Sequence, residues 1–149
     1  MAECVVPSLQ RLMITTQCLQ FTGAGLIALG LLHFVFPRRF NWSEELARLS
    51  PINKQIFLVH TLFIMVVLAL MGGVLLFAPE ALLERSRLAA WVTAGFTIFW
   101  GLRLVIQWFG YSRELWWGKP LETTIHLLFT LAWSWLTWLG WVLWQLQQN

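Results

Sequence analysis

Four long runs of apolar residues, separated by short polar stretches, dominate the pattern along this chain. Each run approaches the ~20 residues that a helix needs to cross ~30 Å of hydrocarbon. A helix satisfies its own backbone hydrogen bonds, so it is the structure that such runs adopt in lipid. The pattern predicts an all-α membrane protein, a four-transmembrane-helix bundle that forms a single integral membrane domain over 1–149. The spans are expected at about 19–36, 56–78, 88–109 and 124–146.

Proline and helix-capping residues mark the borders of these runs. Ser50 precedes Pro51, which fits an N-cap followed by proline in the first turn, and Pro120 starts a later run in the same way. The loop after the first span contains Asn41-Trp-Ser-Glu44, and the loop after the third contains Ser112-Arg-Glu-Leu115. Such patterns are typical of a helix start. We therefore predict short amphipathic helices at the membrane surface in both loops.

The same two loops resemble each other. The nine residues from Ser43 to Pro51 share four identities with the nine residues from Ser112 to Pro120, at a constant offset of 69. The match falls at equivalent places in two pairs of spans, which favours two duplicated helical hairpins. Chance similarity between interfacial loops is the alternative.

Composition and charge support a membrane location and exclude a nucleic-acid surface. Only 11% of the residues are charged, against about 25% in a soluble domain. The net charge of +3 comes from sparse Lys and Arg, without the basic stripe on a soluble fold that nucleic-acid binding requires. Loops 37–54 and 110–123 carry six Lys and Arg, against Arg11, Arg85 and Arg87 on the other side. This bias predicts an inner (cytoplasmic) membrane with both termini outside the cytoplasm.

Polar residues interrupt the four spans at one depth. His33 lies near the end of the first span, and His60 and His126 lie near the starts of the second and fourth. Because consecutive spans alternate in direction, all three histidines fall on the same side of the membrane. Arg103 and Gln107, one turn apart on the third span, reach the same layer. We expect these five residues to form one site that binds a ligand or cofactor, since lipid offers them no hydrogen bonds.

Each of these residues also has a purely structural interpretation. A histidine within one turn of the interface can hydrogen-bond to lipid headgroups or to a loop carbonyl. Arg103, roughly 9 Å inside its span, can snorkel toward the surface or pair with Glu122. Gln107 can serve as a hydrogen-bonding contact between helices.

Three classes of function remain open from the sequence. The first, which the sequence favours, is an accessory or ligand-binding subunit that joins a larger membrane complex or homo-oligomer, with an anionic lipid or quinone headgroup at Arg103. The second is a redox protein in which His60 and His126 hold haem, or in which they and His33 hold zinc or copper. The third is a small lipid-modifying enzyme with a histidine as general base. No nucleophile accompanies the histidines, so whether the chain is an enzyme stays undecided.

Overall fold

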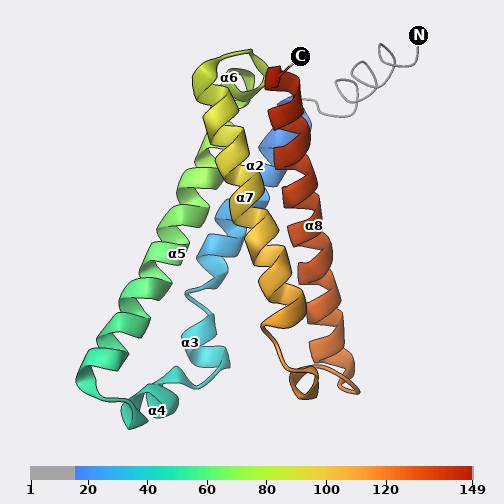
Figure 1. The fold of residues 1–149 in the computed structure, drawn as a ribbon. Coiled ribbons are helices and arrows are strands. Elements are labelled where there is room, and N and C mark those ends of the chain that lie inside the picture. Colours follow the sequence, from blue (N-terminus) through green and yellow to red (C-terminus); the bar gives the residue numbers. More distant parts are fainter. Residues whose placement is uncertain (1–15, 149) are drawn as a thin grey trace. The chain divides into compact units, whose positions relative to one another are not determined.

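The computed structural model describes residues 16–148, and this range consists of helices and short connections with no strand (Figure 1). Three helices, α5, α7 and α8, are long and apolar enough to cross a membrane. They correspond to the second, third and fourth predicted spans. In chain order the elements are α2 (Thr16–Leu32), α3 (Phe36–Arg39), α4 (Trp42–Glu45), η1 (Leu46–Arg48), α5 (Pro51–Phe77), α6 (Pro79–Leu83), α7 (Arg87–Phe109), η2 (Arg113–Leu115) and α8 (Pro120–Gln148).

The first predicted span is only partly confirmed, because α2 is a shorter apolar helix that ends at Leu32. The chain continues through a turn in which the His33 N–H donates to the Gly30 carbonyl, and α3 then begins at Phe36. Pro37 explains the break. A proline ring clashes with the carbonyl four residues earlier, here that of His33, and cannot donate to it. The prediction of a helix through residue 36 is therefore wrong, and His33 lies in the turn after α2.

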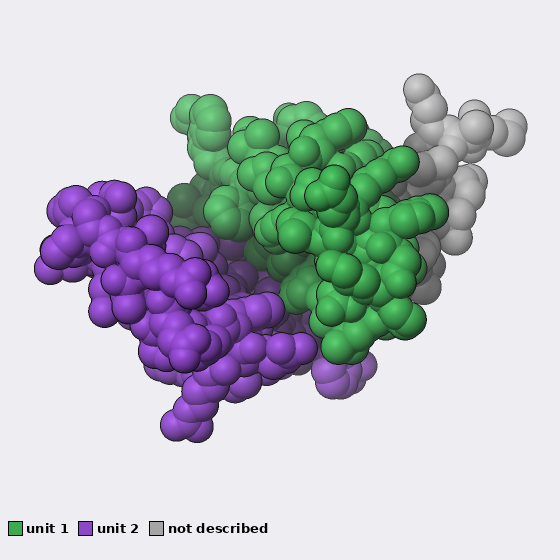
Figure 2. Space-filling model, turned by 90° about the horizontal axis from the view of Figure 1, so that it is seen from below, with its two compact units in different colours: residues 1–11, 81–149 green, residues 12–80 purple. Residues whose placement is uncertain are grey.

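The described chain divides into two compact units, residues 16–80 and residues 81–148 (Figure 2). Helix α2 packs against α5 in the first unit, and α7 packs against α8 in the second. Both α5 and α8 begin at the proline of the repeated loop pattern, Pro51 and Pro120. The two helix pairs match the hairpins that the repeat indicated, while the duplication itself stays a prediction.

The α2–α5 pair is built around two glycines whose backbones touch. A Cβ atom added to Gly23 would lie 2.6 Å from the Gly72 carbonyl oxygen, and one added to Gly72 would lie 2.7 Å from the Gly23 carbonyl oxygen. Small residues allow such close approach and are typical of helix contacts in membranes. Buried leucines line the same two helices, including Leu26 and Leu75.

Side-chain hydrogen bonds join α8 to the segment around the N-terminal end of α7. Ser86 caps α7, since its hydroxyl accepts from the Ala89 N–H at 3.0 Å. Gln147, near the end of α8, donates to the Leu82 carbonyl at 2.8 Å and accepts from the Ser86 N–H at 3.2 Å. Further along the pair, Gly140 packs directly on the Thr97 backbone. The opposite end of this pair is held by side chains that form the candidate site.

The predicted amphipathic loop helices are reduced to single turns. Asn41 adopts a left-handed conformation with φ of 49°, and its side chain donates to the Glu44 carboxylate instead of capping the backbone of α4. The chain then becomes extended at Leu49 and Ser50, as expected for residues that approach a proline. The second loop contains only the 3₁₀ turn η2. The short amphipathic helices at the membrane surface are therefore not confirmed, since each helical element in these loops has three or four residues.

Candidate functional site

Gln107 is the centre of a hydrogen-bonded group at the end of the α7–α8 pair. Its side chain is buried, with 4% of its surface exposed. Its Oε1 accepts from the Trp133 indole N–H at 3.2 Å and from Arg103 Nη1 at 3.2 Å. Its Nε2 lies 2.9 Å from His126 Nδ1. One amide therefore joins the last turns of α7 to the first turns of α8.

These partners fix the orientation of the amide and the tautomer of His126. An indole N–H and a guanidinium can only donate, so Gln107 Oε1 must face Trp133 and Arg103. Gln107 Nε2 also only donates, so His126 Nδ1 must accept. The neutral His126 ring consequently carries its proton on Nε2. His126 thus presents a donor at the nitrogen that Gln107 does not contact.

Arg103 extends toward the C-terminal end of α7. Besides Gln107, its guanidinium donates to the Tyr111 hydroxyl at 3.4 Å, and Tyr111 lies eight residues further along the chain. The guanidinium carbon lies 4.9 Å from the centre of the Trp133 ring and 5.8 Å from that of Tyr111, within cation–π range. No carboxylate pairs with Arg103 among residues 16–148, so the expected alternative pairing with Glu122 is not found there.

Aromatic rings enclose the group. The Trp116 ring stacks on His126, with centroids 4.2 Å apart and planes 3° apart. Trp133 stacks with Trp100 at 5.1 Å and with Phe129 at 5.3 Å. The Thr123 hydroxyl donates to the Trp116 carbonyl and so ties the loop to α8. These contacts restrict the rotamers of the polar side chains between them.

The site contains more hydrogen-bond donors than acceptors. The buried indole N–H groups of Trp100 and Trp116 have no partner, although buried donors in proteins are nearly always paired. His126 Nε2 and the remaining N–H groups of Arg103 also make no hydrogen bond within residues 16–148. Gln107 Oε1 already accepts twice. The unpaired side-chain groups at this end of the α7–α8 pair are therefore donors.

The two other histidines belong to the other unit and bond to their own backbone. His33 Nδ1 lies 2.9 Å from the Leu29 carbonyl oxygen, and His60 Nδ1 lies 2.8 Å from that of Ile56. A carbonyl only accepts, so Nδ1 carries the proton in both rings. Their neutral tautomer is opposite to that of His126. The structure thus brings together Arg103, Gln107 and His126, while His33 and His60 each have a local partner.

The metal alternative gains no support from the described side chains. Residues 16–148 contain no group of three or more His, Cys, Asp or Glu placed to hold a metal ion. The lone pair of His126 faces the Gln107 amide, so this ring as placed offers no ligand nitrogen.

Sequence reasoning missed two members of the site, Tyr111 and Trp116. Tyr111 follows the end of α7 at Phe109, so helical spacing from Arg103 does not extend to it. Trp116 lies in the loop, where no helical periodicity applies. The shared face of His126 and Trp133, seven residues apart on α8, was visible in the sequence.

Similarity to known proteins adds no function to this geometry. Comparison of the chain with protein-family models, with curated proteins and with solved structures finds no match in any of the three.

Proposed function

We propose that this chain is a small polytopic membrane protein of the accessory, ligand-binding kind, and that the α7–α8 pair binds the polar headgroup of an amphiphile. The surplus of donors around Gln107 carries this proposal. Arg103 and His126 offer N–H groups that make no hydrogen bond among residues 16–148, while Gln107 Oε1 and His126 Nδ1, the acceptors beside them, are already engaged. A headgroup with phosphate, carboxylate or carbonyl oxygens supplies the missing acceptors.

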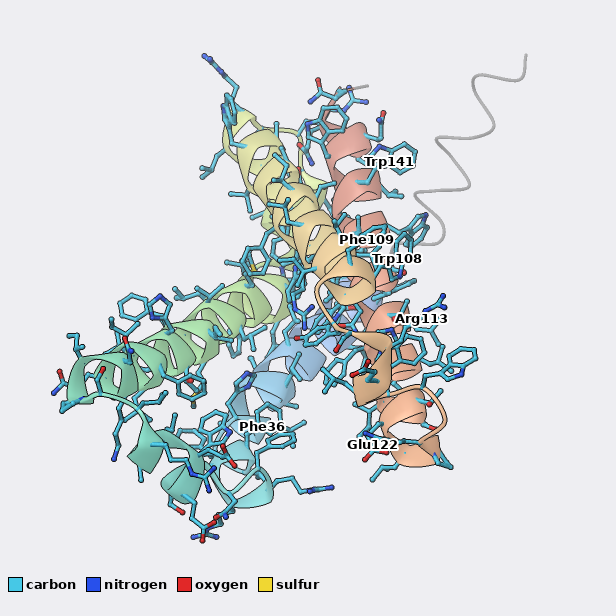
Figure 3. All side chains as sticks on the ribbon, turned by 60° about the horizontal axis from the view of Figure 1, so that its bottom comes forward. Phe36, Trp108, Phe109, Arg113, Glu122 and Trp141 are labelled. Atoms are coloured by element: carbon cyan, nitrogen blue, oxygen red, sulfur yellow. The ribbon has the colours of Figure 1, made fainter. Side chains whose placement is uncertain are left out.

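The surroundings of the site suit a molecule with an apolar tail. Large apolar side chains are exposed at the same end of the pair, among them Trp108, Phe109 and Trp117. Figure 3 labels Trp108 and Phe109 at the end of α7, with Arg113 in the loop that follows and Glu122 at the start of α8. Exposed aromatic rings at helix ends are typical of the membrane interface. A headgroup at Arg103 would leave its tail along these apolar faces.

The proposal includes a membrane topology. Helices α2, α5, α7 and α8 form a four-helix bundle, with loops 37–54 and 110–123 on the cytoplasmic side of an inner membrane and both termini outside. The headgroup site then lies at the cytoplasmic face. Arg11, which contributes to the charge bias on the other side, lies outside the described residues.

The two other classes of function have less support. A haem or metal redox function needs several ligands gathered at one place, and residues 16–148 contain no group of three or more His, Cys, Asp or Glu placed to hold a metal ion. A lipid-modifying enzyme needs a general base beside a nucleophile, and the hydrogen bond to Gln107 occupies the only unprotonated nitrogen of His126. Binding of a headgroup requires neither a set of metal or haem ligands nor a general base.

Arg103→Gln should remove the amphiphile that co-purifies with the chain. Native mass spectrometry of the protein in mild detergent is expected to detect a bound molecule on the wild type, and at least about tenfold less of it on the variant, because a charged hydrogen-bond donor is lost. Arg87→Gln is the matched control, since Arg87 is exposed at the opposite end of the same helix. Equal retention of the molecule in both variants would contradict a site at Arg103.

A further inference from the structure

We infer that the ligand of this site is an oxyanion, supplied by the phosphodiester of an anionic glycerophospholipid. The inference rests on the proposed headgroup site and names its ligand class. Its basis is the charge of the α7–α8 end, the unpaired donors of Arg103 and His126 and the apolar side chains beside them.

Charge favours an anion over a neutral carbonyl. Arg103 is always protonated, it lies on an apolar helix long enough to span a membrane, and no carboxylate pairs with it among the described residues. The loop charges at this end cancel, since Arg113 and Lys119 are balanced by Glu114 and Glu122. Arg103 therefore leaves one net positive charge at this end. A quinone carbonyl would accept a hydrogen bond but would leave that charge uncompensated.

The donors are arranged for more than one oxygen. The guanidinium uses one N–H on Gln107 and one on Tyr111, and a guanidinium has five in a planar fork. That fork suits two oxygens of one anion. His126 and Arg103 bond to the two ends of the same Gln107 amide, so one side chain connects the two residues that carry the unpaired donors.

The source of the oxyanion is a lipid. Arg103 starts inside α7 and reaches toward the end where Phe109 is 82% exposed and Trp108 and Leu115 are exposed as well. In a bilayer these apolar side chains would contact acyl chains, and the guanidinium would lie near the phosphates. Free phosphate would accept hydrogen bonds from Arg103 but would make no contact that explains the exposed apolar side chains beside it.

Gln107→Glu tests the inference with almost no change of shape. The carboxylate would still accept from Arg103 and Trp133, and its other oxygen would accept from His126 once the proton of that ring moves to Nδ1. The variant thus places an internal anion beside Arg103. Binding of phosphatidylglycerol in detergent, measured by titration against thermal unfolding, is expected to weaken at least about tenfold, because the internal pair competes with the lipid. Gln148→Glu adds the same charge at the exposed end of α8 and should bind like the wild type.

Four probes separate the possible ligands. The wild type is expected to bind phosphatidylglycerol more tightly than phosphatidylcholine, and to bind inorganic phosphate and a short-chain ubiquinone weakly. Saturation by inorganic phosphate with displacement of the lipid would overturn the lipid source. Binding of ubiquinone alone would overturn the oxyanion and leave the headgroup site standing. If none of the four probes binds, the proposed function fails as well.

A second variant keeps the test valid if Gln107→Glu does not fold. His126→Phe retains a ring to stack on Trp116 and removes the Nε2 donor. Its affinity for phosphatidylglycerol should fall several-fold while Arg103 still provides the charge. The matched control is His60→Phe, which changes a histidine that bonds only to its own helix. Unchanged affinity in both Gln107→Glu and His126→Phe would overturn the inference.

Discussion

Gln107→Leu should lower the free energy of unfolding of the α7–α8 pair by about 2–4 kcal/mol, because three hydrogen bonds end on this buried amide. Two of them, with Trp133 and His126, join α7 to α8, and hydrogen bonds between membrane helices contribute about 0.6–1.7 kcal/mol each. The third, from Arg103, lies within α7. Removing the amide also leaves the Trp133 N–H buried without a partner, which adds a desolvation cost. The measurement is unfolding in mixed micelles at increasing SDS, followed by tryptophan fluorescence.

The control for this prediction is Gln148→Leu. Gln148 is exposed at the end of α8, so the same change there should alter stability by less than about 0.5 kcal/mol. Equal stability of the two variants would mean that the hydrogen bonds of Gln107 do not hold the helices together.

Gly72→Ala should destabilise the α2–α5 pair by about 1–3 kcal/mol. A methyl group at this position would lie 2.7 Å from the Gly23 carbonyl oxygen and 2.8 Å from Ile27 Cγ1. Backbone cannot move away as a flexible side chain can, so the two helices must separate and lose contact along their length. Overpacking of this kind typically has a cost of this size. The same SDS titration measures it.

The neighbouring residue offers a close control. A methyl group at Gly73 would meet nothing nearer than Phe77 Cδ2 at 4.0 Å. Gly73→Ala should therefore be neutral or slightly stabilising, since alanine favours the helix by up to about 1 kcal/mol over glycine. Similar destabilisation by both substitutions would contradict a direct backbone contact at Gly72.

The helices were largely predictable, because a long apolar run has few alternatives in lipid. Hydropathy located α5, α7 and α8 and misplaced the end of α2. The apolar run continues to Phe36, so composition does not reveal the break. Pro37 does, through the clash of its ring with the carbonyl of His33, and this local rule outweighs hydropathy at that position.

The contacts among Arg103, Gln107 and His126 were predictable where helical spacing applies, while ligand binding by them stays a prediction. Arg103 and Gln107 lie one turn apart, and the alternation of spans placed His126 opposite them. The stack of Trp116 on His126 was not predictable, since loop conformation follows no simple period. Depth alone also grouped His33 and His60 with the site. In the structure each of these two rings has a partner one turn earlier, the Leu29 carbonyl for His33 and the Ile56 carbonyl for His60. A ligand shared with His126 stays a prediction.

The central claim is that Gln107 holds Arg103, Trp133 and His126 in place and leaves unpaired hydrogen-bond donors beside them. The most direct test of this claim is to determine the tautomers of the three histidines. Nitrogen-15 NMR of the labelled protein at pH 8, where imidazoles are largely neutral, distinguishes protonated from unprotonated ring nitrogens, and single His→Phe variants assign the signals. The structure predicts a proton on Nε2 of His126 and on Nδ1 of His33 and His60. A proton on Nδ1 of His126 would contradict the account, because Gln107 would then have to turn its oxygen away from Arg103 and Trp133.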